Sequence, residues 1–446
     1  MRSTRTSRRF VRSLALLAVA GLAVAGCGGG GSTPPADATA TTGVTITVAL
    51  ASQPPPAAAL AAFQKQTGIT VTWSNIDWDS LQTKITAAAT ANTYFADATD
   101  VDWSRVGQLA KLKAFHPMGD YLDTAALGKD MPQLTSFTSG GAVVGVPYDA
   151  SFMVTTVNRA MFTRAGVSAT PTTMAAYTAG LAQIKAKGMT QYPLSIPFAA
   201  AEGLSTYWYQ TTAAFGGTIL DESGKPQFGA ADSGGRKAAA WMVDAFSKGL
   251  VPPGNINVTD AQGQQTLMAK GKVASVFSDY SGIVGSLYNV PASSTVANQV
   301  TYLPTPGVAG PGANLSNPDG IGIPRTARHP DAAAKFITWF TSAANQADFA
   351  GLNGSGKALP SYPLPSRLSV VDQLTAKGQL IGGDQLGRML KSSSGPVFKG
   401  GAPSWYPEFS RAVNTNLHAA AAGQMTADKA VDAIAAVADR LARANS

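Results

Sequence analysis

Five short stretches of the sequence place aromatic rings next to carboxylates or an arginine, each just after a predicted strand or in a loop. Trp78 is a sixth, weaker candidate, and Asp100 lies inside the strand that precedes the first stretch. Aromatic rings stack on the weakly apolar C–H faces of a sugar, while carboxylates, amides and guanidinium groups bind its hydroxyls. The residues of the five stretches are Asp102, Trp103 and Arg105; Tyr148, Asp149 and Ser151; Glu202, Tyr207 and Trp208; Asp279 and Tyr280; Trp405 and Tyr406.

Each of these residues also has a structural interpretation. Trp241 and Trp339 lie on the apolar faces of predicted helices and are expected in the core. Trp103, Trp208 and Trp405 have polar neighbours, so the pattern fits a binding cleft and a core position equally well. The same holds for the acids, since an aspartate can shape a turn and a glutamate can cap a helix.

The scarcity of histidine and cysteine argues against several kinds of active site. The three histidines, His116, His329 and His418, are far apart in the sequence, and Cys27 is the only cysteine. A zinc site of the usual Cys/His type lacks ligands, and a Ser-His-Asp triad would need one of three isolated histidines. We therefore expect no metal, no cofactor and no catalytic residue.

The first 26 residues have the pattern of a signal peptide: five arginines within the first twelve residues, then an uncharged apolar run over residues 14–25. The Val-Ala-Gly-Cys sequence of residues 24–27 resembles the lipobox of bacterial lipoproteins, which implies cleavage before Cys27 and lipidation of its thiol. An ordinary signal peptide with an incidental cysteine is the alternative. Residues 27–43 are rich in glycine, proline and threonine, as is typical of a flexible linker.

Composition favours a folded chain of two domains. The chain has 446 residues, of which 45% are hydrophobic and 13% charged. Its net charge is +8, but the signal peptide contains five basic and no acidic residues, so the remainder carries only +3. A charge that small does not predict nucleic-acid binding.

Strand and helix patterns alternate from residue 44 onward. Predicted strands cover residues 44–50, 69–73, 140–149, 152–158 and 272–278, and predicted helices cover residues 57–67, 80–91, 173–187, 236–248, 331–345, 408–422 and the segment from 427. Strand–helix–strand order near the start is typical of an α/β fold with a parallel sheet.

These elements, in this order, resemble the extracellular solute-binding proteins of ABC importers, in the family that includes maltose-binding protein. The segments that carry the resemblance are residues 95–115, 141–167, 248–254, 270–282 and 328–340. It implies a two-lobed periplasmic-binding-protein-like fold of type II, with ligand held in a cleft between the lobes and a hinge near residues 149–151. Lobe one would comprise residues 44–150 and 304–357, and lobe two residues 151–303 and 358–446.

The resemblance implies a receptor rather than an enzyme. We expect a monomer on the outer face of the cell membrane, anchored by lipid alone, that passes a sugar or oligosaccharide to permease subunits. Two alternatives stay open: another small solute, such as a polyamine, an amino-sugar derivative or a glycerol phosphate derivative, or an extracellular glycoside hydrolase with paired carboxylates.

Overall fold

The computed structural model describes residues 43–259, 261–351, 364–380, 383–392 and 394–445. The signal peptide, Cys27, nearly all of the linker and residues 358–363 of the predicted second lobe lie outside the described residues. Among the residues described, no helix has the length and apolar character needed to cross a bilayer.

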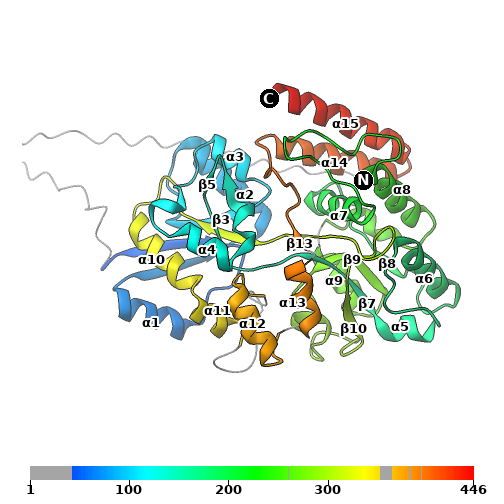
Figure 1. The fold of residues 1–446 in the computed structure, drawn as a ribbon, viewed down its shortest axis with the longest axis horizontal. Coiled ribbons are helices and arrows are strands. Elements are labelled where there is room, and N and C mark those ends of the chain that lie inside the picture. Colours follow the sequence, from blue (N-terminus) through cyan, green and yellow to red (C-terminus); the bar gives the residue numbers. More distant parts are fainter. Residues whose placement is uncertain (1–42, 260, 352–363, 381–382, 393, 446) are drawn as a thin grey trace, which may run out of the picture. The chain divides into compact units, whose positions relative to one another are not determined.

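A five-stranded sheet forms the centre of what we call lobe one (Figure 1). The predicted parallel arrangement holds only for β2, β1 and β3, because β12 enters antiparallel between β3 and β6. In spatial order the strands are β2 (Thr70–Asn75), β1 (Thr45–Leu50), β3 (Ala98–Asp102), β12 (Asp319–Gly322) and β6 (Val146–Pro147).

The helices of lobe one differ from prediction at one point. The predicted helix over residues 331–345 is two helices, because the chain turns at Thr341 and the Ser342 hydroxyl caps a new start by accepting from Asn345 N. The lobe-one helices are α1 (Ala57–Thr67), α2 (Trp78–Ala91), α3 (Val106–Lys111), α4 (Thr124–Asp130), α10 (Pro330–Phe340) and α11 (Ala343–Phe349). Ile46, Val48, Phe63 and Phe336 belong to the core on one side of the sheet.

A four-stranded sheet forms the centre of lobe two. Its order is β10 (Val300–Leu303), β7 (Met153–Asn158), β9 (Ser275–Tyr280) and β8 (Leu194–Ser195), with β7 antiparallel to both of its neighbours. Its helices are α5 (Arg159–Arg164), α6 (Met174–Ala186), α7 (Glu202–Ala214), α8 (Gly234–Ser247), α9 (Ala261–Ala269), α12 (Leu368–Ala376), α13 (Gly383–Ser392), α14 (Tyr406–Ala421) and α15 (Ala427–Ala444).

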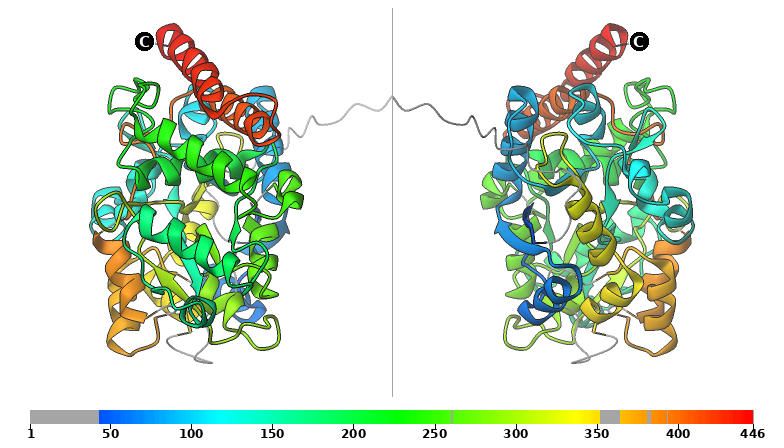
Figure 2. Two further views of the ribbon diagram at one scale, coloured as in Figure 1. Left: turned by 90° about the vertical axis from the view of Figure 1, so that its right-hand side faces the viewer. Right: turned by 90° about the vertical axis from the view of Figure 1, so that its left-hand side faces the viewer.

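The C-terminal helices complete lobe two. In both views of Figure 2, α14 and α15 run together at one end of the lobe, and α14 also packs on α7 and α8. Phe409, Val413 and Leu417 of α14 are buried, as the helical spacing of these residues predicts. Helix α12 instead packs against the other side of the sheet, where Val370 and Val371 share a core with Val154 of β7.

The rest of the described structure includes short 3₁₀ and π-helical turns and two two-stranded sheets. The predicted strand over residues 140–149 is only two short strands, β5 (Ala142–Val143) and β6. Strand β5 pairs with β4 (Thr138–Ser139), and β11 (Asn314–Leu315) pairs with β13 (Ser394–Gly395). The helical turns are η1 (Met118–Asp120), η2 (Pro132–Phe137), η3 (Pro253–Asn257) and η4 (Val284–Tyr288).

Candidate functional site

Three segments cross between the two sheets and lie against one another. Residues 148–152 connect β6 to β7, and residues 316–318 lead back into β12. Asn317 N donates to Ser151 O at 2.9 Å. The third segment, residues 364–367 before α12, lies alongside because Ala150 N donates to Leu364 O at 3.1 Å. The predicted hinge residues 149–151 are therefore part of a small bundle of crossing segments.

Four aspartates gather at the lobe-one end of these crossings, and we call them the aspartate cluster: Asp100, Asp102, Asp149 and Asp319. Asp100 and Asp102 are two apart on β3 and so point to the same side of the sheet. The antiparallel register sets Asp319 of β12 directly opposite Asp102, and Asp319 N donates to Asp149 Oδ1 at 2.8 Å. Strand pairing across about 200 residues thus collects carboxylates that are remote in sequence.

Burial and mutual repulsion disfavour the charged forms of this cluster. Burial, and then the nearby charge of Asp102, raise the pKa of Asp100 to about 8. Burial raises the pKa of Asp149 to about 6, although the Ser151 hydroxyl, 2.6 Å from Asp149 Oδ2, stabilises the ionised form. Burial and the charge of Asp149 raise the pKa of Asp319 well above its usual value.

Helix α2 and the turn before α3 bring further polar groups to the cluster. The Gln82 side chain is only 3% exposed, and its Nε2 donates to Asp100 Oδ2 at 2.5 Å. The Arg105 guanidinium lies over the Trp78 ring, 5.3 Å from its centroid, and Arg105 Nε is buried without a hydrogen-bond partner among the described residues. Trp78, the weakest of the sequence candidates, therefore lies beside Arg105.

Lobe two faces this cluster with Glu202, the first residue of α7. Glu202 accepts hydrogen bonds from the Tyr406 hydroxyl and from Ser410 Oγ, the latter at 2.7 Å. Burial raises the pKa of Glu202; Arg105 acts in the opposite direction and Asp102 in the same direction. Because Arg105 and Asp102 belong to lobe one, charges of both lobes act on one another here.

Aromatic rings also meet across the lobes. The Trp103 ring centroid lies 6.2 Å from that of Phe398 and 6.3 Å from that of Tyr406, and Trp103 Nε1 donates to Asn317 Oδ1 at 2.9 Å. Close by, a Cβ on Gly107 would lie 2.2 Å from Ala402 O, so α3 touches the loop before α14 through backbone. The lobes are in contact at this edge.

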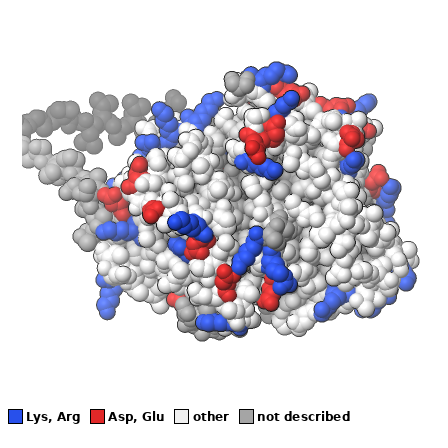
Figure 3. All heavy atoms as spheres, in the orientation of Figure 1, with Lys and Arg blue, Asp and Glu red and all other residues white. Residues whose placement is uncertain are grey.

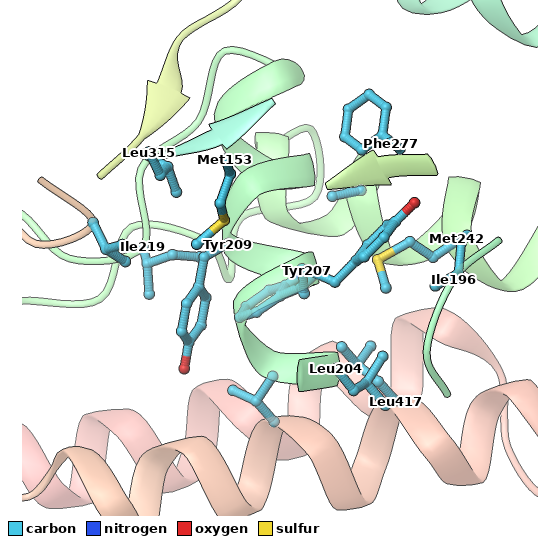
Figure 4. Close-up of a cluster of buried hydrophobic side chains, with 14 of the residues drawn as sticks. Met153, Ile196, Leu204, Tyr207, Tyr209, Ile219, Met242, Phe277, Leu315 and Leu417 are labelled. Carbon is cyan, nitrogen blue, oxygen red and sulfur yellow. The ribbon is translucent and has the colours of Figure 1, made fainter. Parts of the chain in front are cut away.

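Two predicted site residues, Tyr207 and Trp208, lie in the core of lobe two instead. The sequence interpretation put them in a loop, whereas they lie within α7, whose side chains are buried on nearly all sides. Trp208 is fully buried, donates from Nε1 to Gly235 O at 2.9 Å and packs edge-on against Phe228. Figure 4 shows Tyr207 in the same core as Ile196, Leu204 and Met242.

Tyr148 and Asp279 are also placed inside a lobe. Tyr148 belongs to the lobe-one core, with its ring centroid 5.5 Å from that of Phe340. Asp279 accepts hydrogen bonds from Thr156 Oγ1 at 2.8 Å, from the Tyr288 hydroxyl at 2.7 Å and from Tyr280 N at 2.9 Å. Burial raises the pKa of Asp279 to about 6. These hydrogen bonds engage both carboxylate oxygens of Asp279 with groups of lobe two.

The remaining candidates lie in or next to the crossing segment of residues 148–152 and in the loop before α14. Tyr280, at the end of β9, keeps 40% of its surface exposed. Ser151 lies in the crossing segment and binds Asp149 through its hydroxyl. Trp405 precedes α14 and packs edge-on against Phe409, with 9% of its surface exposed.

Sequence reasoning missed three residues that the structure brings to the site: Gln82, Asn317 and Asp319. Gln82 is the polar residue between Leu81 and Ile85 on the buried side of α2, a signal that the sequence offers. Asp319 and Asn317 offered none, because their role depends on the register of β12. Two hollows of lobe one, one between α2 and Pro324 and a wider one between α1 and α10, contain none of the predicted site residues.

Comparison with known proteins decides the family. The profile of the bacterial extracellular solute-binding proteins matches residues 51–347. The chain belongs to this family. The profile match confirms the family expected from the sequence. Solved structures of similar fold confirm the expected α/β, two-lobed architecture.

The similar proteins are distant in sequence. MalE3 of T. maritima, solved with maltose, is 21% identical, with 89% of this chain and 100% of that chain covered and a TM-score of 0.74. A solute-binding protein of Agrobacterium radiobacter K84, solved with ribitol, is 23% identical, with coverage of 90% and 99% and a TM-score of 0.73. One of Agrobacterium vitis S4, solved with D-mannitol, is 20% identical at the same coverage and TM-score.

Among curated sequences, a binding protein of Brucella abortus strain 2308 is 26% identical over 214 residues. The alignment covers 48% of this chain and 51% of that protein. The chain therefore spans about half the length of the curated relatives it matches.

Proposed function

We propose that this protein captures a sugar or polyol between its two lobes and delivers it to the permease of an ABC importer. The observation that carries the proposal is the convergence of Asp102 and Arg105 of lobe one with Glu202 and Tyr406 of lobe two. Carboxylates and a guanidinium beside aromatic rings suit a ligand with many hydroxyls. The maltose, ribitol and mannitol bound by proteins of the same fold support this ligand class.

The proposed binding set differs from the sequence prediction. It retains Asp102, Trp103, Arg105, Asp149, Ser151, Glu202, Tyr280, Trp405 and Tyr406, and it adds Trp78 and the other members of the aspartate cluster. Tyr148, Tyr207, Trp208 and Asp279 are left out, because their side chains are buried within one lobe.

A thermal-shift screen against a library of sugars and polyols tests the ligand class. A ligand that binds only the native state raises the melting temperature by mass action. Titration calorimetry of each hit with the Asp102→Ala and Glu202→Ala variants then tests the site. If the hits bind both variants as they bind wild type, the proposed cleft is wrong.

We propose that the lobes part and close around this ligand through the crossing segments near residues 149–151. Closure is favoured only when the ligand contacts both lobes. Lobe one would comprise residues 44–150 and 304–357, and lobe two residues 151–303 and 358–446. Small-angle scattering with and without saturating ligand measures the change; equal radii of gyration in the two states would contradict a hinge.

The anchor forms a separate part of the proposal. Cleavage before Cys27 and lipidation of its thiol would hold a monomer on the outer face of the cell membrane. A Cys27→Ala variant, expressed in the native host, should move from the membrane fraction to the medium. Continued membrane retention of that variant would contradict the anchor.

The protein acts as a receptor and not as a glycoside hydrolase in this proposal. Membership in a family of binding proteins supports the receptor, whereas the paired acids of the cleft are the feature that a hydrolase would share. Incubation with oligosaccharides separates the two, because hydrolysis creates new reducing ends and binding creates none.

A further inference from the structure

The aspartate cluster has many more acidic groups than basic ones. Its members act on one another electrostatically, and Glu202 of lobe two acts with Asp102. Arg105 is the cation that acts on this group, and among the described residues it has no carboxylate at salt-bridge distance. On the face drawn in Figure 3, by contrast, positive and negative residues are interspersed. The excess of acidic over basic groups is therefore a property of the aspartate cluster and not of that face of the protein.

Hydrogen bonds are distributed unevenly over the cluster: Asp149 receives three, whereas Asp100 and Asp102 receive fewer. The Gln82 amide donates to Asp100, and its buried Oε1, on the same amide, has no partner among the described residues. Ser104 supplies the hydrogen bonds to Asp102, from its N at 2.8 Å and from its hydroxyl, and both reach Oδ1. A buried acceptor without a partner costs about 1–3 kcal/mol. A ligand group with several hydrogen-bond donors would therefore suit the aspartate cluster.

We propose that the ligand is an amino sugar, bound with its protonated amine at the aspartate cluster. This inference rests on the proposed function and narrows its substrate class. An ammonium group offers three donors and one positive charge, which suit the unpaired Gln82 Oε1 and the carboxyl groups around it. Trp78 and Trp103 provide ring faces beside it for the sugar.

Arg105 distinguishes an amino sugar from a simple polyamine. Its guanidinium has only donors, and its Nε lacks a partner. Sugar hydroxyl oxygens can accept from it, whereas a fully protonated polyamine offers no acceptor and would be repelled by the same charge. The combination of acids and one unpaired arginine therefore suits a ligand that is cationic at one end and hydroxylated at the other.

Binding of the amine should release protons. Asp100, with a pKa of about 8, is largely protonated near neutral pH, and burial shifts the pKa of Asp319 in the same direction. A bound ammonium favours their ionised forms. The groups that face them are Asp102 on β3, Gln82 on α2, Asp149 on the crossing segment and Arg105 before α3. Calorimetry in buffers of different ionisation enthalpy counts the protons released.

The test uses matched sugars that differ at carbon 2 in one group: hydroxyl, free amine or N-acetyl amide. Glucose, maltose and cellobiose, with their 2-amino and N-acetyl counterparts, cover three frameworks, and spermidine serves as the polyamine arm. For a framework that binds, we expect the free amine to bind at least tenfold more tightly than the other two forms. Proton release should accompany the amine alone.

Variants locate the effect. Asp100→Asn and Asp319→Asn keep the size of the side chain and should abolish the preference for the amine, while Asp279→Asn, in the lobe-two core, should retain it. Melting curves check that each variant is folded. Tighter or equal binding of the hydroxyl forms overturns the inference and leaves the proposed function standing. Binding of spermidine alone, or of none of the sugars, overturns both.

Discussion

Asp279 of lobe two and the aspartate cluster of lobe one look alike in sequence and differ in their surroundings. Each contains buried carboxyl groups at or near the end of a strand, and burial raises the pKa values of Asp279, Asp100, Asp149 and Asp319. Asp279 receives three hydrogen bonds from its own lobe, whereas Asp100 receives one, from Gln82, and Asp102 receives two, both at Oδ1. Satisfied acids stabilise a fold; acids with spare acceptors are candidates for binding. Trp208 and Trp103 differ in another way: both are buried and hydrogen-bonded, but Trp208 packs within lobe two, whereas Trp103 of lobe one packs against Phe398 and Tyr406 of lobe two.

The largest effect should come from Trp208. Trp208→Ala removes a fully buried ring and its hydrogen bond to Gly235 O, and we expect a loss of about 3–5 kcal/mol in the free energy of unfolding. Urea denaturation measures the loss. Affinity for a sugar hit should not change in the folded fraction, whereas Trp103→Ala, which removes a buried ring between the lobes, should lower both stability and affinity. The reverse result for the two tryptophans would break the comparison.

Asp279→Ala should follow in size. The substitution leaves the hydroxyls of Thr156 and Tyr288 and the amide of Tyr280 without their acceptor, so we expect a loss of about 2–4 kcal/mol of stability. Asp102→Ala is the matched variant in the cluster and should weaken ligand binding by about 1–3 kcal/mol. Loss of affinity in Asp279→Ala at full stability would show that Asp279 contacts ligand.

Local patterns in the sequence predict most helices well. The predicted helix over residues 173–187 is α6. Thr173 fixes its start, because this residue has extended backbone angles and its side chain accepts a hydrogen bond from Ala176 N. Helix α7 was missed for a physical reason. Because Ser205, Trp208, Gln210 and Thr211 are all buried, its sequence lacks the polar face that marks an amphipathic helix.

Pairing between distant strands could not be predicted from local patterns. Alternation of side chains indicates a strand but not its direction or partner, so the entry of β12 between β3 and β6 was out of reach. The sequence therefore identified Asp102 and Asp149 as site candidates and missed Asp319, which joins them only through that register. It also counted Asp279 as equivalent, because hydrogen bonds from Thr156 and Tyr288 depend on packing.

The cluster should make stability depend on pH. The pKa of Asp100 rises from 3.8 in the unfolded chain to about 8 in the folded one. Its contribution is therefore fully present below about pH 4 and is lost as the pH rises through about 8. Between pH 5 and pH 8.5, wild type should lose on the order of 4 kcal/mol more stability than Asp100→Asn, as measured by urea denaturation. Parallel pH profiles of the two proteins would contradict the raised pKa of Asp100.

Gly107 tests the contact between the lobes. A methyl group there would overlap the backbone of Ala402 and Pro403, so Gly107→Ala should force α3 away from that loop and weaken ligand binding by about 1–2 kcal/mol. Small-angle scattering of the ligand-bound protein should show a larger radius of gyration. Gly119→Ala is the control, since its nearest neighbour, Thr124 Oγ1, lies 3.9 Å away. Equal affinity in both variants would mean that binding does not need this contact.

Tyr280 should give the smallest effect, and it tests whether lobe two contributes a ring to the cleft. It follows Asp279 on β9, so alternation turns the tyrosine away from the side that buries the carboxylate. Tyr280→Ala keeps the backbone bond to Asp279 and should cost little stability, because 40% of the side chain is already exposed. Loss of a stacked ring should weaken binding by about 0.5–1.5 kcal/mol, measured by titration calorimetry. Tyr280→Phe retains the ring and should bind like wild type. If the alanine variant also binds like wild type, Tyr280 does not stack on the ligand. The aromatic contacts of the cleft then come from Trp78, Trp103 and Trp405, of which only Trp405 belongs to lobe two.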